Sequence, residues 1–367
     1  MTRLAIVLEQ CLAPVPGGTG RYARELATAL AATAPPGSTV TGWTAYHRDP
    51  AAARIPSAGG PHRLPLPRRA LVIAWERGLG PTPRGDLVHA PTPLAPRRAS
   101  GRPLVVTVHD TVPWTHPGTL TPRGVAWHQR AIGYAARAAD RIVVPTHAVA
   151  AELAAIFPAA ARRIAVISEG VSAGLTPPPD AAERAVRLRL PDGGYLLSLA
   201  TLEPRKGLDV LLAALASPKA PDLPLVVVGQ PGWGGVDPLA KAAELGLRPD
   251  RVRLLGRLPD ADLAVVLSRA TVLAAPSRAE GFGLPPLEAM AAGVPVVSSD
   301  APALVEVGGG ATLVVPRDDH AALAEALAQV VHDGELRAGL VERGRRRAAE
   351  FSWTASGRAL WRLYDDL

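Results

Sequence analysis

Short apolar runs rich in Val, Ile and Leu alternate along the chain with longer Ala-rich segments. The runs lack a strict alternation of apolar and polar residues, which is typical of strands buried on both faces of a sheet. The segments between them carry apolar residues at the three-to-four-residue spacing of helices that cover a sheet. The pattern therefore predicts parallel sheets with helices on both faces.

Two sets of buried strands are expected, one in each half of the chain. The first comprises residues 4–8, 87–89, 104–108 and 142–144, and the second 195–199, 225–228, 252–255, 272–274, 296–297 and 312–315. Helical spacing is found at 20–32, 123–138, 148–156, 208–216, 238–245, 261–268, 286–292, 320–331 and 335–350, and again at 354–367. Each half is therefore predicted to be a doubly wound, Rossmann-like α/β domain.

The boundary between the halves is expected at the three prolines 177–179. Consecutive prolines continue neither a helix nor a central strand, and they make a stiff spacer. We therefore predict one domain over residues 1–178 and a second over 179–351, with a last helix over 352–367. The length of 367 residues fits two domains of about 150 residues each.

Composition excludes several classes of protein. With 48% hydrophobic and 20% charged residues, the chain is not largely disordered. Cys11 is the only cysteine, so no intrachain disulfide and no Cys-based zinc site can form, and a reducing compartment fits. No apolar stretch approaches the roughly 20 residues that span a bilayer, and residues 1–9 lack the features of a secretory signal. We expect a cytoplasmic protein.

The net charge of +7 favours an anionic partner. Candidate anionic partners are nucleotide phosphates, anionic lipid headgroups and nucleic acid. Because helices of the first domain carry basic residues, one expectation is peripheral contact with the inner face of a membrane. Lysines are few, and no aromatic residues are interleaved with the basic ones, which argues against nucleic acid.

Two candidate motifs lie in the first half. Residues 16–22 (PGGTGRY) join the first strand to a helix, where glycines and free N–H groups can receive an anion. The segment matches neither G-x-G-x-x-G nor the Walker pattern, and alone it is better explained as an ordinary turn. His109 and Asp110 follow a strand at the edge that faces the ligand in open α/β sheets. His109 can bind a sugar hydroxyl or cap the next turn, and Trp114 can stack on a saccharide or pack in the core.

The second half contains two further motifs, each after a strand. In residues 200–207 (ATLEPRKG), Arg205 and Lys206 form a cationic pair suited to a pyrophosphate, although a solvated turn is the alternative. In residues 276–290, Glu280 and Glu288 bracket a glycine-containing loop that leads into a helix. Glu280 can accept hydrogen bonds from sugar hydroxyls, and Glu288 can bind the two ribose hydroxyls of a nucleotide.

Asp260 and Asp262 resemble a D-x-D metal motif, but they open a helical run directly after Pro259. Asp260 as the N-cap, with Asp262 in the first turn near the helix dipole, explains them without a metal. No G-x-S-x-G elbow is present for serine catalysis. The sequence therefore predicts no metal site and no bound cofactor.

Taken together, these motifs resemble the family 4 retaining glycosyltransferases, which have the GT-B fold. The similarity runs over nearly the whole chain, and its most specific part is the E-x7-E signature from Glu280 to Glu288, followed by AGVPVV at 292–297. The resemblance implies two doubly wound Rossmann-like domains that face a cleft. It also implies an acceptor-binding N-terminal domain, a donor-binding C-terminal domain, and a final helix that packs back on the N-terminal domain.

The resemblance implies a role for each motif residue in the N-terminal domain. Gly18 would lie against the donor phosphates, and His109 would lie beside the transferred sugar as a catalytic residue. Asp110 and Trp114 would be on the acceptor side. The family usually has Asn where this chain has Glu169, so the resemblance leaves open what the added negative charge does to substrate binding.

The resemblance also implies the roles of the C-terminal motifs. Arg205 and Lys206 would hold the pyrophosphate, Glu280 would be the second catalytic residue, and Glu288 would bind the ribose. The other donor contacts would come from backbone groups near the base and sugar, namely those of Arg257, Leu258, Gly281, Phe282, Gly283 and Leu284. The sequences of these motifs are most similar to those of mannosyltransferases, so GDP-mannose is the expected donor.

The expected reaction is transfer of a hexose from a nucleotide-diphospho-sugar to an acceptor hydroxyl of a glycan, glycolipid or small natural product, with retention of the anomeric configuration and without a metal. Two other classes stay open. A nucleotide-sugar epimerase of the same architecture would need no acceptor. A basic nucleic-acid-binding protein would bind DNA with a steep salt dependence.

Overall fold

A computed structural model describes residues 1–367 and divides them into two compact units. Unit 1 comprises Met1–Pro117, Pro122–Gly170 and Ser352–Leu367, and unit 2 comprises Gly118–Thr121 and Val171–Phe351. The long N-terminal part of unit 1 ends at Gly170, a few residues before the prolines 177–179. The reason is that the short 3-10 turn Ala173–Leu175 packs on a helix of unit 2 and buries Leu175.

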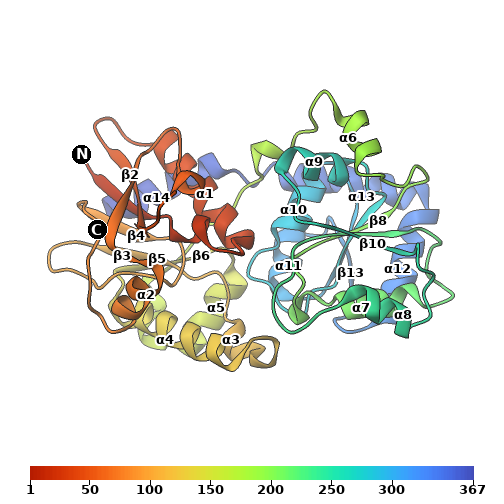
Figure 1. Cartoon of the computed structure of the whole chain (residues 1–367), viewed down its shortest axis with the longest axis horizontal. Coiled ribbons are helices and arrows are strands. Elements are labelled where there is room, and N and C mark those ends of the chain that lie inside the picture. The colour runs from red at the N-terminus through yellow and green to blue at the C-terminus, as the bar shows by residue number, and fades with distance from the viewer. The chain divides into compact units, whose positions relative to one another are not determined.

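Unit 1 is built on a seven-stranded, all-parallel sheet in the order β3-β2-β1-β4-β5-β6-β7. Its strands are β1 (Arg3–Val7), β2 (Thr39–Tyr46), β3 (Gly59–Pro67), β4 (Leu87–Ala90), β5 (Leu104–Thr107), β6 (Arg141–Val144) and β7 (Ile164–Val166). Its helices are α1 (Gly17–Ala32), α2 (Arg68–Glu76), α3 (Val112–Thr115), α4 (Pro122–Ala138), α5 (His147–Ile156) and α14 (Trp353–Asp365). In Figure 1, α1 and α14 cover one face of this sheet, and α2 and α4 cover the other.

Unit 2 is built on a six-stranded, all-parallel sheet in the order β10-β9-β8-β11-β12-β13. Its strands are β8 (Leu196–Leu199), β9 (Leu225–Val228), β10 (Val252–Gly256), β11 (Val272–Ala275), β12 (Val296–Ser299) and β13 (Leu313–Val315). Its helices are α6 (Ala181–Arg187), α7 (Leu208–Leu215), α8 (Pro238–Glu244), α9 (Asp260–Ser268), α10 (Leu284–Ala291), α11 (Pro302–Gly308), α12 (His320–His332) and α13 (Gly334–Ala348). Right-handed crossovers place α7 and α8 on one face and α9 and α10 on the other (Figure 1).

The prediction of two parallel, helix-covered sheets is confirmed. Each sheet carries its own core of aliphatic side chains from strands and covering helices, as expected for runs without alternation. The sequence missed the strands on the outer part of the first sheet. β3 contains three prolines, which an edge strand tolerates because one side needs no ladder hydrogen bonds, and β7 is only three residues long.

The last helix, α14, belongs to unit 1 although it follows unit 2 in the chain. The Trp361 indole donates a hydrogen bond to the carbonyl of Leu30 at the end of α1, 2.9 Å away. Gly357 lies so close to Ala29 that an added Cβ would stand 3.0 Å from its carbonyl oxygen. Close backbone approach at Gly357 and apolar burial of Leu360, Trp361 and Tyr364 therefore seat α14 against α1.

Candidate active site

The second sheet brings together the two motifs of the C-terminal half. Strands β9 and β10 lie on one side of β8, and β11, β12 and β13 lie on the other, so the strand order reverses between β8 and β11. Loops at the carboxyl ends of such neighbouring strands form the ligand crevice of open α/β sheets. Residues 200–207 follow β8, and residues 276–283 follow β11. Arg205, Lys206 and Glu280 therefore meet at this switch point.

Glu280 lies at the centre of a nearly buried charged cluster. Lys206 Nζ donates to Glu280 Oε1 at 2.6 Å, and Arg205 Nη1 donates to Glu280 Oε2 at 3.1 Å. Ser277 Oγ donates to Oε1 at 2.8 Å. Burial alone would raise the pKa of the Glu280 carboxyl, but the charges of Lys206 and Arg205 and the hydrogen bonds from Lys206 and Ser277 lower it to about 2. The carboxylate is ionised and satisfies both cations.

A second carboxylate also faces the guanidinium of Arg205. Arg205 Nη2 is 3.1 Å from Glu203 Oε1, and the Glu203 side chain is 3% exposed. Two cations and two carboxylates thus share one small volume, and the cluster is electrically balanced. An entering diphosphate would exchange carboxylate oxygens for phosphate oxygens around Arg205 and Lys206, which suits a site that binds an anion reversibly.

The two loops that form this cluster are fastened together through their backbones. The amide of Arg278 donates to the carbonyl of Arg205 at 2.7 Å. Gly207 has φ of +67° and presses against the carbonyl of Pro276, so that any side chain at this position would collide with it. The Arg278 guanidinium donates to Pro204 O at 2.7 Å and to the Asp209 carboxylate at 2.8 and 2.9 Å. Arg278 therefore holds the cation-bearing loop in place.

Helix α10 begins directly beyond this cluster. Gly283 stands at its N-cap with φ of +106°, and prolines occupy the first turn, where no intrahelical N–H is needed. Glu288 lies on α10 and is buried, with 4% of its surface exposed. The Phe282 ring packs edge-on against Phe351 at 5.6 Å, so only the backbone of Phe282 is placed to bind a ligand. The backbone at 281–284 thus leads into a helix N-terminus beside the charged cluster.

The other predicted donor contacts are spread more widely. Arg257 and Leu258 follow β10, the edge strand, which β9 separates from β8. Arg257 is exposed and Leu258 is half-buried.

Helix α9 begins at Asp260 with Pro259 as its N-cap, so the prediction that Asp260 is the N-cap is wrong. Asp262 pairs with Arg184 at 2.7 Å and with Arg187 at 2.9 Å. These ion pairs give the D-x-D sequence a structural role.

In unit 1, His109 follows β5 and is held by a residue that follows the neighbouring strand β4. His109 Nε2 is 2.8 Å from the carbonyl oxygen of Pro91. A carbonyl only accepts, so Nε2 carries a hydrogen and donates it. Nδ1 lies 3.7 Å from Oε1 of Glu169, whose side chain is 5% exposed. The Tyr22 ring meets the imidazole edge to face at 4.6 Å. Glu169, the departure from the family pattern, therefore places its charge beside His109.

The two acceptor-side residues have local contacts. Asp110 accepts a hydrogen bond from the amide of Val112 at 3.2 Å, which caps the turn into α3. The Trp114 ring is half-buried in the core of unit 1 and packs against Phe157 at 5.5 Å. The contacts of Trp114 are thus those of a core residue, and the roles of Asp110 and Trp114 toward an acceptor stay predictions.

Gly18 lies in the first turn of α1, which begins at Gly17. A Cβ added at Gly18 would meet no atom within 4 Å, whereas one at Gly20 would stand 2.5 Å from Pro16 Cβ. Internal packing therefore explains the glycine at position 20 but not the one at 18. The open space at Gly18 would let a ligand approach the backbone closely.

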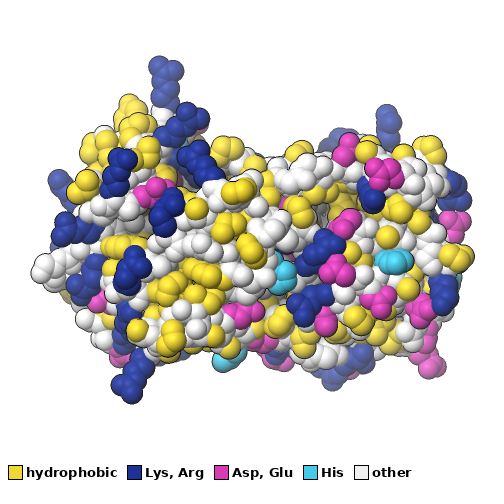
Figure 2. Space-filling view, turned by 90° about the horizontal axis from the view of Figure 1, so that it is seen from below, with side chains coloured by type: hydrophobic (Ala, Val, Ile, Leu, Met, Phe, Trp, Pro, Cys, Tyr) yellow, Lys and Arg dark blue, Asp and Glu magenta, His cyan; other side chains and the backbone are white.

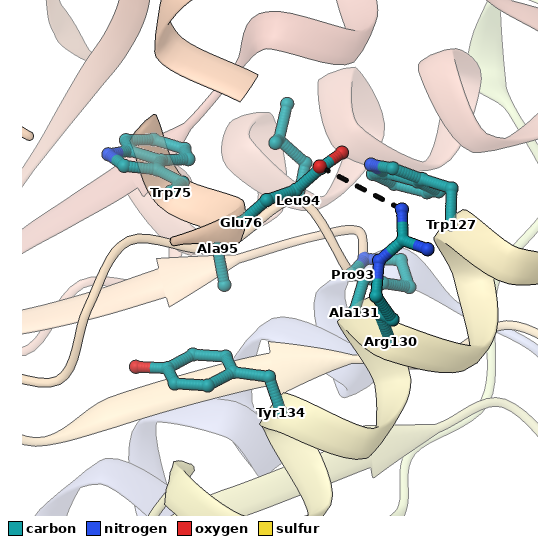
Figure 3. Close-up of a pocket in the computed structure, with 9 residues that line it drawn as sticks. All are labelled: Trp75, Glu76, Pro93, Leu94, Ala95, Trp127, Arg130, Ala131 and Tyr134. Atoms are coloured by element: carbon teal, nitrogen blue, oxygen red, sulfur yellow. Dashed lines mark ion pairs between the residues drawn. The ribbon is translucent and has the colours of Figure 1, made fainter. Parts of the chain in front are cut away.

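A separate hollow lies on unit 1 between α2 and α4 (Figure 3). Trp75, Trp127 and Tyr134 line it, and Glu76 and Arg130 form an ion pair across it at 3.8 Å. Its volume of about 40 Å³ holds little more than a water molecule. This hollow is too small for a nucleotide-sugar.

Several site residues escaped the sequence reasoning. Each of these residues lies within a motif but was assigned no role: Tyr22 in 16–22, Glu203 in 200–207, and Ser277 and Arg278 in 276–290. Arginine and glutamate are common on protein surfaces, so their types alone carry no signal. The positions of Ser277 and Arg278, directly after β11 and within the strongest motif, are the one signal that could have identified them.

Comparison with known proteins places the chain in a family. The model of Glycosyltransferase Family 4 matches residues 16–174, and that of Glycosyl transferases group 1 matches residues 179–347. The chain is 32% identical to the O-antigen chain mannosyltransferase B of Escherichia coli over 272 residues, which are 73% of this chain and 71% of that protein. The chain therefore belongs to glycosyltransferase family 4, and the resemblance drawn from its motifs is confirmed.

Two further relatives match over shorter segments. Phosphatidyl-myo-inositol mannosyltransferase of Mycolicibacterium smegmatis is 39% identical over 168 residues, 44% of this chain and 42% of the relative. D-inositol 3-phosphate glycosyltransferase of Salinispora arenicola is 34% identical over 250 residues, 62% of this chain and 55% of the relative. The chain thus spans about half the length of these two relatives.

Solved structures confirm the predicted GT-B fold. Sucrose-phosphate synthase from Thermosynechococcus elongatus superposes with a TM-score of 0.77 at 24% identity, covering 100% of this chain and 99% of that chain. HepE of Anabaena in complex with UDP-glucose superposes with a TM-score of 0.73 at 20% identity, covering all of both chains. The chain is a glycosyltransferase of the GT-B type.

Proposed function

We propose that this glycosyltransferase moves a hexose from a nucleotide-diphospho-sugar to an acceptor hydroxyl with retention of configuration. The observation that carries the proposal is the cluster of Arg205, Lys206 and Glu280 at the strand-order switch point. A pyrophosphate leaving group needs neutralisation as its bond to the sugar breaks, and two nearly buried cations supply it. Because these cations are part of the protein, the proposed reaction needs no metal.

The proposed donor pose follows from the residues around the cluster. The diphosphate lies against Arg205 and Lys206, the ribose against Glu288, the sugar against Glu280 and the backbone of residues 281–284, and the base near Arg257 and Leu258. For unit 1, the family resemblance supplies the proposed roles: Gly18 against the donor phosphates and His109 beside the transferred sugar. Once phosphate oxygens engage the two cations, the Glu280 carboxylate is released to accept hydrogen bonds from sugar hydroxyls.

The proposed chemistry is a substitution at the anomeric carbon on one face of the sugar. The bond from this carbon to the β-phosphate oxygen breaks, and a bond to the acceptor oxygen forms. The acceptor proton passes to the leaving phosphate oxygen, so the products are the glycoside and the nucleoside diphosphate. The side chains position the reactants and stabilise the charges on the diphosphate and the sugar cation. Glu280 and His109 are the proposed catalytic residues.

GDP-mannose is the proposed donor. Two of the relatives are named mannosyltransferases, and their names are the support for mannose. The HepE structure holds UDP-glucose, which makes UDP-glucose the donor to test against GDP-mannose. The acceptor class stays broad: a glycan, a glycolipid or a small natural product.

A panel of nucleotide-sugars in a thermal-shift assay tests the donor. A donor that binds only the folded protein at 100 times its Kd adds about 2.7 kcal/mol of stability and raises the melting temperature. We expect GDP-mannose and GDP to raise it more than UDP-glucose and UDP. A larger shift with the uridine compounds would replace the proposed donor, and no shift with any of them would overturn the donor site.

Product analysis separates the transferase from an epimerase of the same architecture. With donor and no acceptor, the proposed enzyme leaves the sugar of the nucleotide-sugar unchanged apart from slow hydrolysis. Conversion of the donor to its epimer, or to free sugar and nucleotide at full rate without acceptor, would favour the epimerase. DNA binding that falls steeply with salt would instead revive the nucleic-acid-binding alternative.

Peripheral contact of unit 1 with an anionic membrane surface is part of the proposal, with the enzyme in the cytoplasm. Unit 1 carries 21 Lys and Arg against 11 Asp and Glu, a net charge of +10, whereas unit 2 carries 19 against 22, a net charge of −3. Figure 2 shows basic side chains around apolar ones on one face of unit 1. Ile73 and Leu79 are exposed apolar residues of unit 1. No helix is long and apolar enough to cross a bilayer. Sedimentation with vesicles of anionic lipid, lost at high salt, is the expected result.

A further inference from the structure

A chain of buried hydrogen bonds connects the C-terminal helix α14 to the strand that carries His109. Tyr364 Oη is 2.6 Å from His89 Nδ1, and His89 Nε2 is 2.9 Å from Thr107 Oγ1. Thr107 Oγ1 is in turn 3.2 Å from Tyr22 Oη. Every one of these four side chains is at least 95% buried. Such a closed polar network specifies one arrangement of its members, because each unpaired group would be costly.

The ionisation states within the network follow from its burial. Burial, together with the nearby His109, lowers the pKa of His89 to about 3, so its ring is neutral. Burial also raises the pKa of Tyr364, which keeps its hydroxyl proton. A neutral imidazole donates from one nitrogen and accepts at the other. Either the Tyr364 hydroxyl donates to Nδ1 and Nε2–H donates to Thr107, or Nδ1–H donates to Tyr364 and the Thr107 hydroxyl donates to Nε2. In both arrangements each ring nitrogen has a partner.

The network ends against the His109 ring. Thr107 is the last residue of β5, two positions before His109. The last hydroxyl of the network is that of Tyr22, which contacts Thr107 Oγ1. The Tyr22 ring packs against His109 at 4.6 Å and against Trp353 of α14 at 5.6 Å. Tyr22 is therefore held between the imidazole and α14 by its ring and is tied to β5 by its hydroxyl.

Helix α14 also holds the segment that carries Glu169, on the Nδ1 side of His109. Ser356 Oγ donates to the carbonyl of Ser168 at 2.6 Å. Gly170 lies directly on the backbone of Trp353, where no Cβ would fit. The two residues on either side of Glu169 are thus fixed by α14, and the Glu169 carboxylate lies 3.7 Å from His109 Nδ1.

We propose that Tyr364 is a positioning residue for His109 and acts through His89, Thr107 and Tyr22. The inference rests on the catalytic role of His109 under the proposed function. Tyr364 touches no reacting atom in this assignment. Its hydroxyl orients the His89 ring through Nδ1, His89 orients Thr107 and Tyr22, and these orient the imidazole to which the proposed function assigns the transferred sugar. Misplacing a group in the site by about 1 Å can cost up to about 100-fold in rate.

The test compares two conservative variants, Tyr364→Phe and Tyr134→Phe. Each removes one hydrogen-bonded hydroxyl from unit 1, since Tyr134 Oη accepts from the amide of Arg98 at 2.7 Å. The Tyr134 hydroxyl has no link to His109, so this variant is the matched control. The measurements are the imidazole ¹⁵N NMR signals of His109, assigned with His109→Ala, and the values of kcat and of KM for GDP-mannose.

In Tyr364→Phe we expect shifted His109 signals and a kcat lowered about 10-fold, with KM for the donor within about twofold, because geometry rather than donor binding is lost. Tyr134→Phe should change neither measurement. Unchanged His109 signals in Tyr364→Phe, or equal changes in both variants, would overturn the proposal. The NMR comparison needs no turnover. If the wild-type enzyme transfers no sugar, the proposed function fails, and the spectra still decide whether the network positions His109.

A double-mutant cycle provides the second test and covers the case of a poorly folded Tyr364→Phe. Thr107→Val keeps the shape of the side chain and cuts the network at its middle. If the network acts as one unit, the double variant loses no more kcat than the worse single variant. Additive losses would mean independent structural effects and would contradict the proposal. If Tyr364→Phe does not fold, Thr107→Val takes its place, with the same expected shift of the His109 signals.

Discussion

The candidate sites of the two units are built in opposite ways. In unit 2, two cations and their carboxylate partners are concentrated in one nearly buried cluster. In unit 1, a single imidazole is held by a carbonyl, an aromatic ring and a carboxylate, behind which lies an uncharged hydrogen-bond network. The first arrangement suits binding of a highly charged group, and the second suits exact placement of one ring. Changes in unit 2 should therefore act mainly on donor binding, and changes near His109 mainly on turnover.

The largest effect is expected from Lys206→Ala. The variant removes a cation from a nearly buried cluster and should lower kcat/KM for the donor about 100-fold, which is about 3 kcal/mol, as for a lost hydrogen bond to a charged group. Lys219→Ala is the matched control, because Lys219 also pairs with a glutamate, Glu325, but on the exposed surface. Equal kinetics for the two variants would remove Lys206 from the donor site.

His109→Ala tests the other half of the comparison. We expect kcat to fall by about 10- to 100-fold, typical of a lost catalytic group, while the affinity for GDP in calorimetry stays within about twofold. His128→Ala serves as control, since His128 bonds only to the carbonyl of Gly124 within α4. If the His109 variant loses GDP binding but keeps its kcat, then His109 acts in donor binding rather than in turnover. This result would contradict the comparison between the units.

The ionisation of Glu280 should be visible in the pH dependence of stability. Its folded pKa of about 2 lies below the ordinary value of 4.5, so it contributes stability that is fully present above pH 4.5 and is lost as the pH falls toward 2. Glu280→Gln should therefore show a shallower loss of unfolding free energy than wild type between pH 4.5 and 3, measured by urea denaturation. Parallel curves for the two proteins would mean that the carboxylate is not held ionised by Arg205 and Lys206.

The smallest effect is expected from removing divalent metal. If Arg205 and Lys206 neutralise the diphosphate, turnover after treatment with a chelator should stay within about twofold of the untreated enzyme. Recovery of lost activity by Mg²⁺ or Mn²⁺ would show that the cationic side chains are not sufficient.

The sequence predicts the fold better at the centres of the sheets than at their edges. Central strands such as β5 and β9 are continuous apolar runs, and both appear within one residue of their predicted ends. The edge strand β3 carries polar residues and prolines that a buried strand excludes, so apolar pattern alone could not find it. Helix α10 begins at Leu284, two residues before the start predicted at residue 286, because its first turn tolerates prolines at 285 and 286.

At the site, residue types were predictable but partnerships were not. The strand-end positions of His109, Arg205, Lys206 and Glu280 follow from the parallel-sheet pattern. That Lys206 pairs with Glu280, 74 positions away, depends on β8 and β11 being neighbours, which strand order alone decides. The bond from His109 to Pro91 and the link from Tyr364 to His89 likewise depend on tertiary contacts without a local signal.

A structure of the protein with GDP bound tests the central claim most directly. We predict that β-phosphate oxygens lie within hydrogen-bond distance of Lys206 Nζ and the Arg205 guanidinium, and that the Glu288 carboxylate accepts from the ribose hydroxyls. A nucleotide held elsewhere, with the ion pairs between Glu280 and the two cations intact, would contradict it.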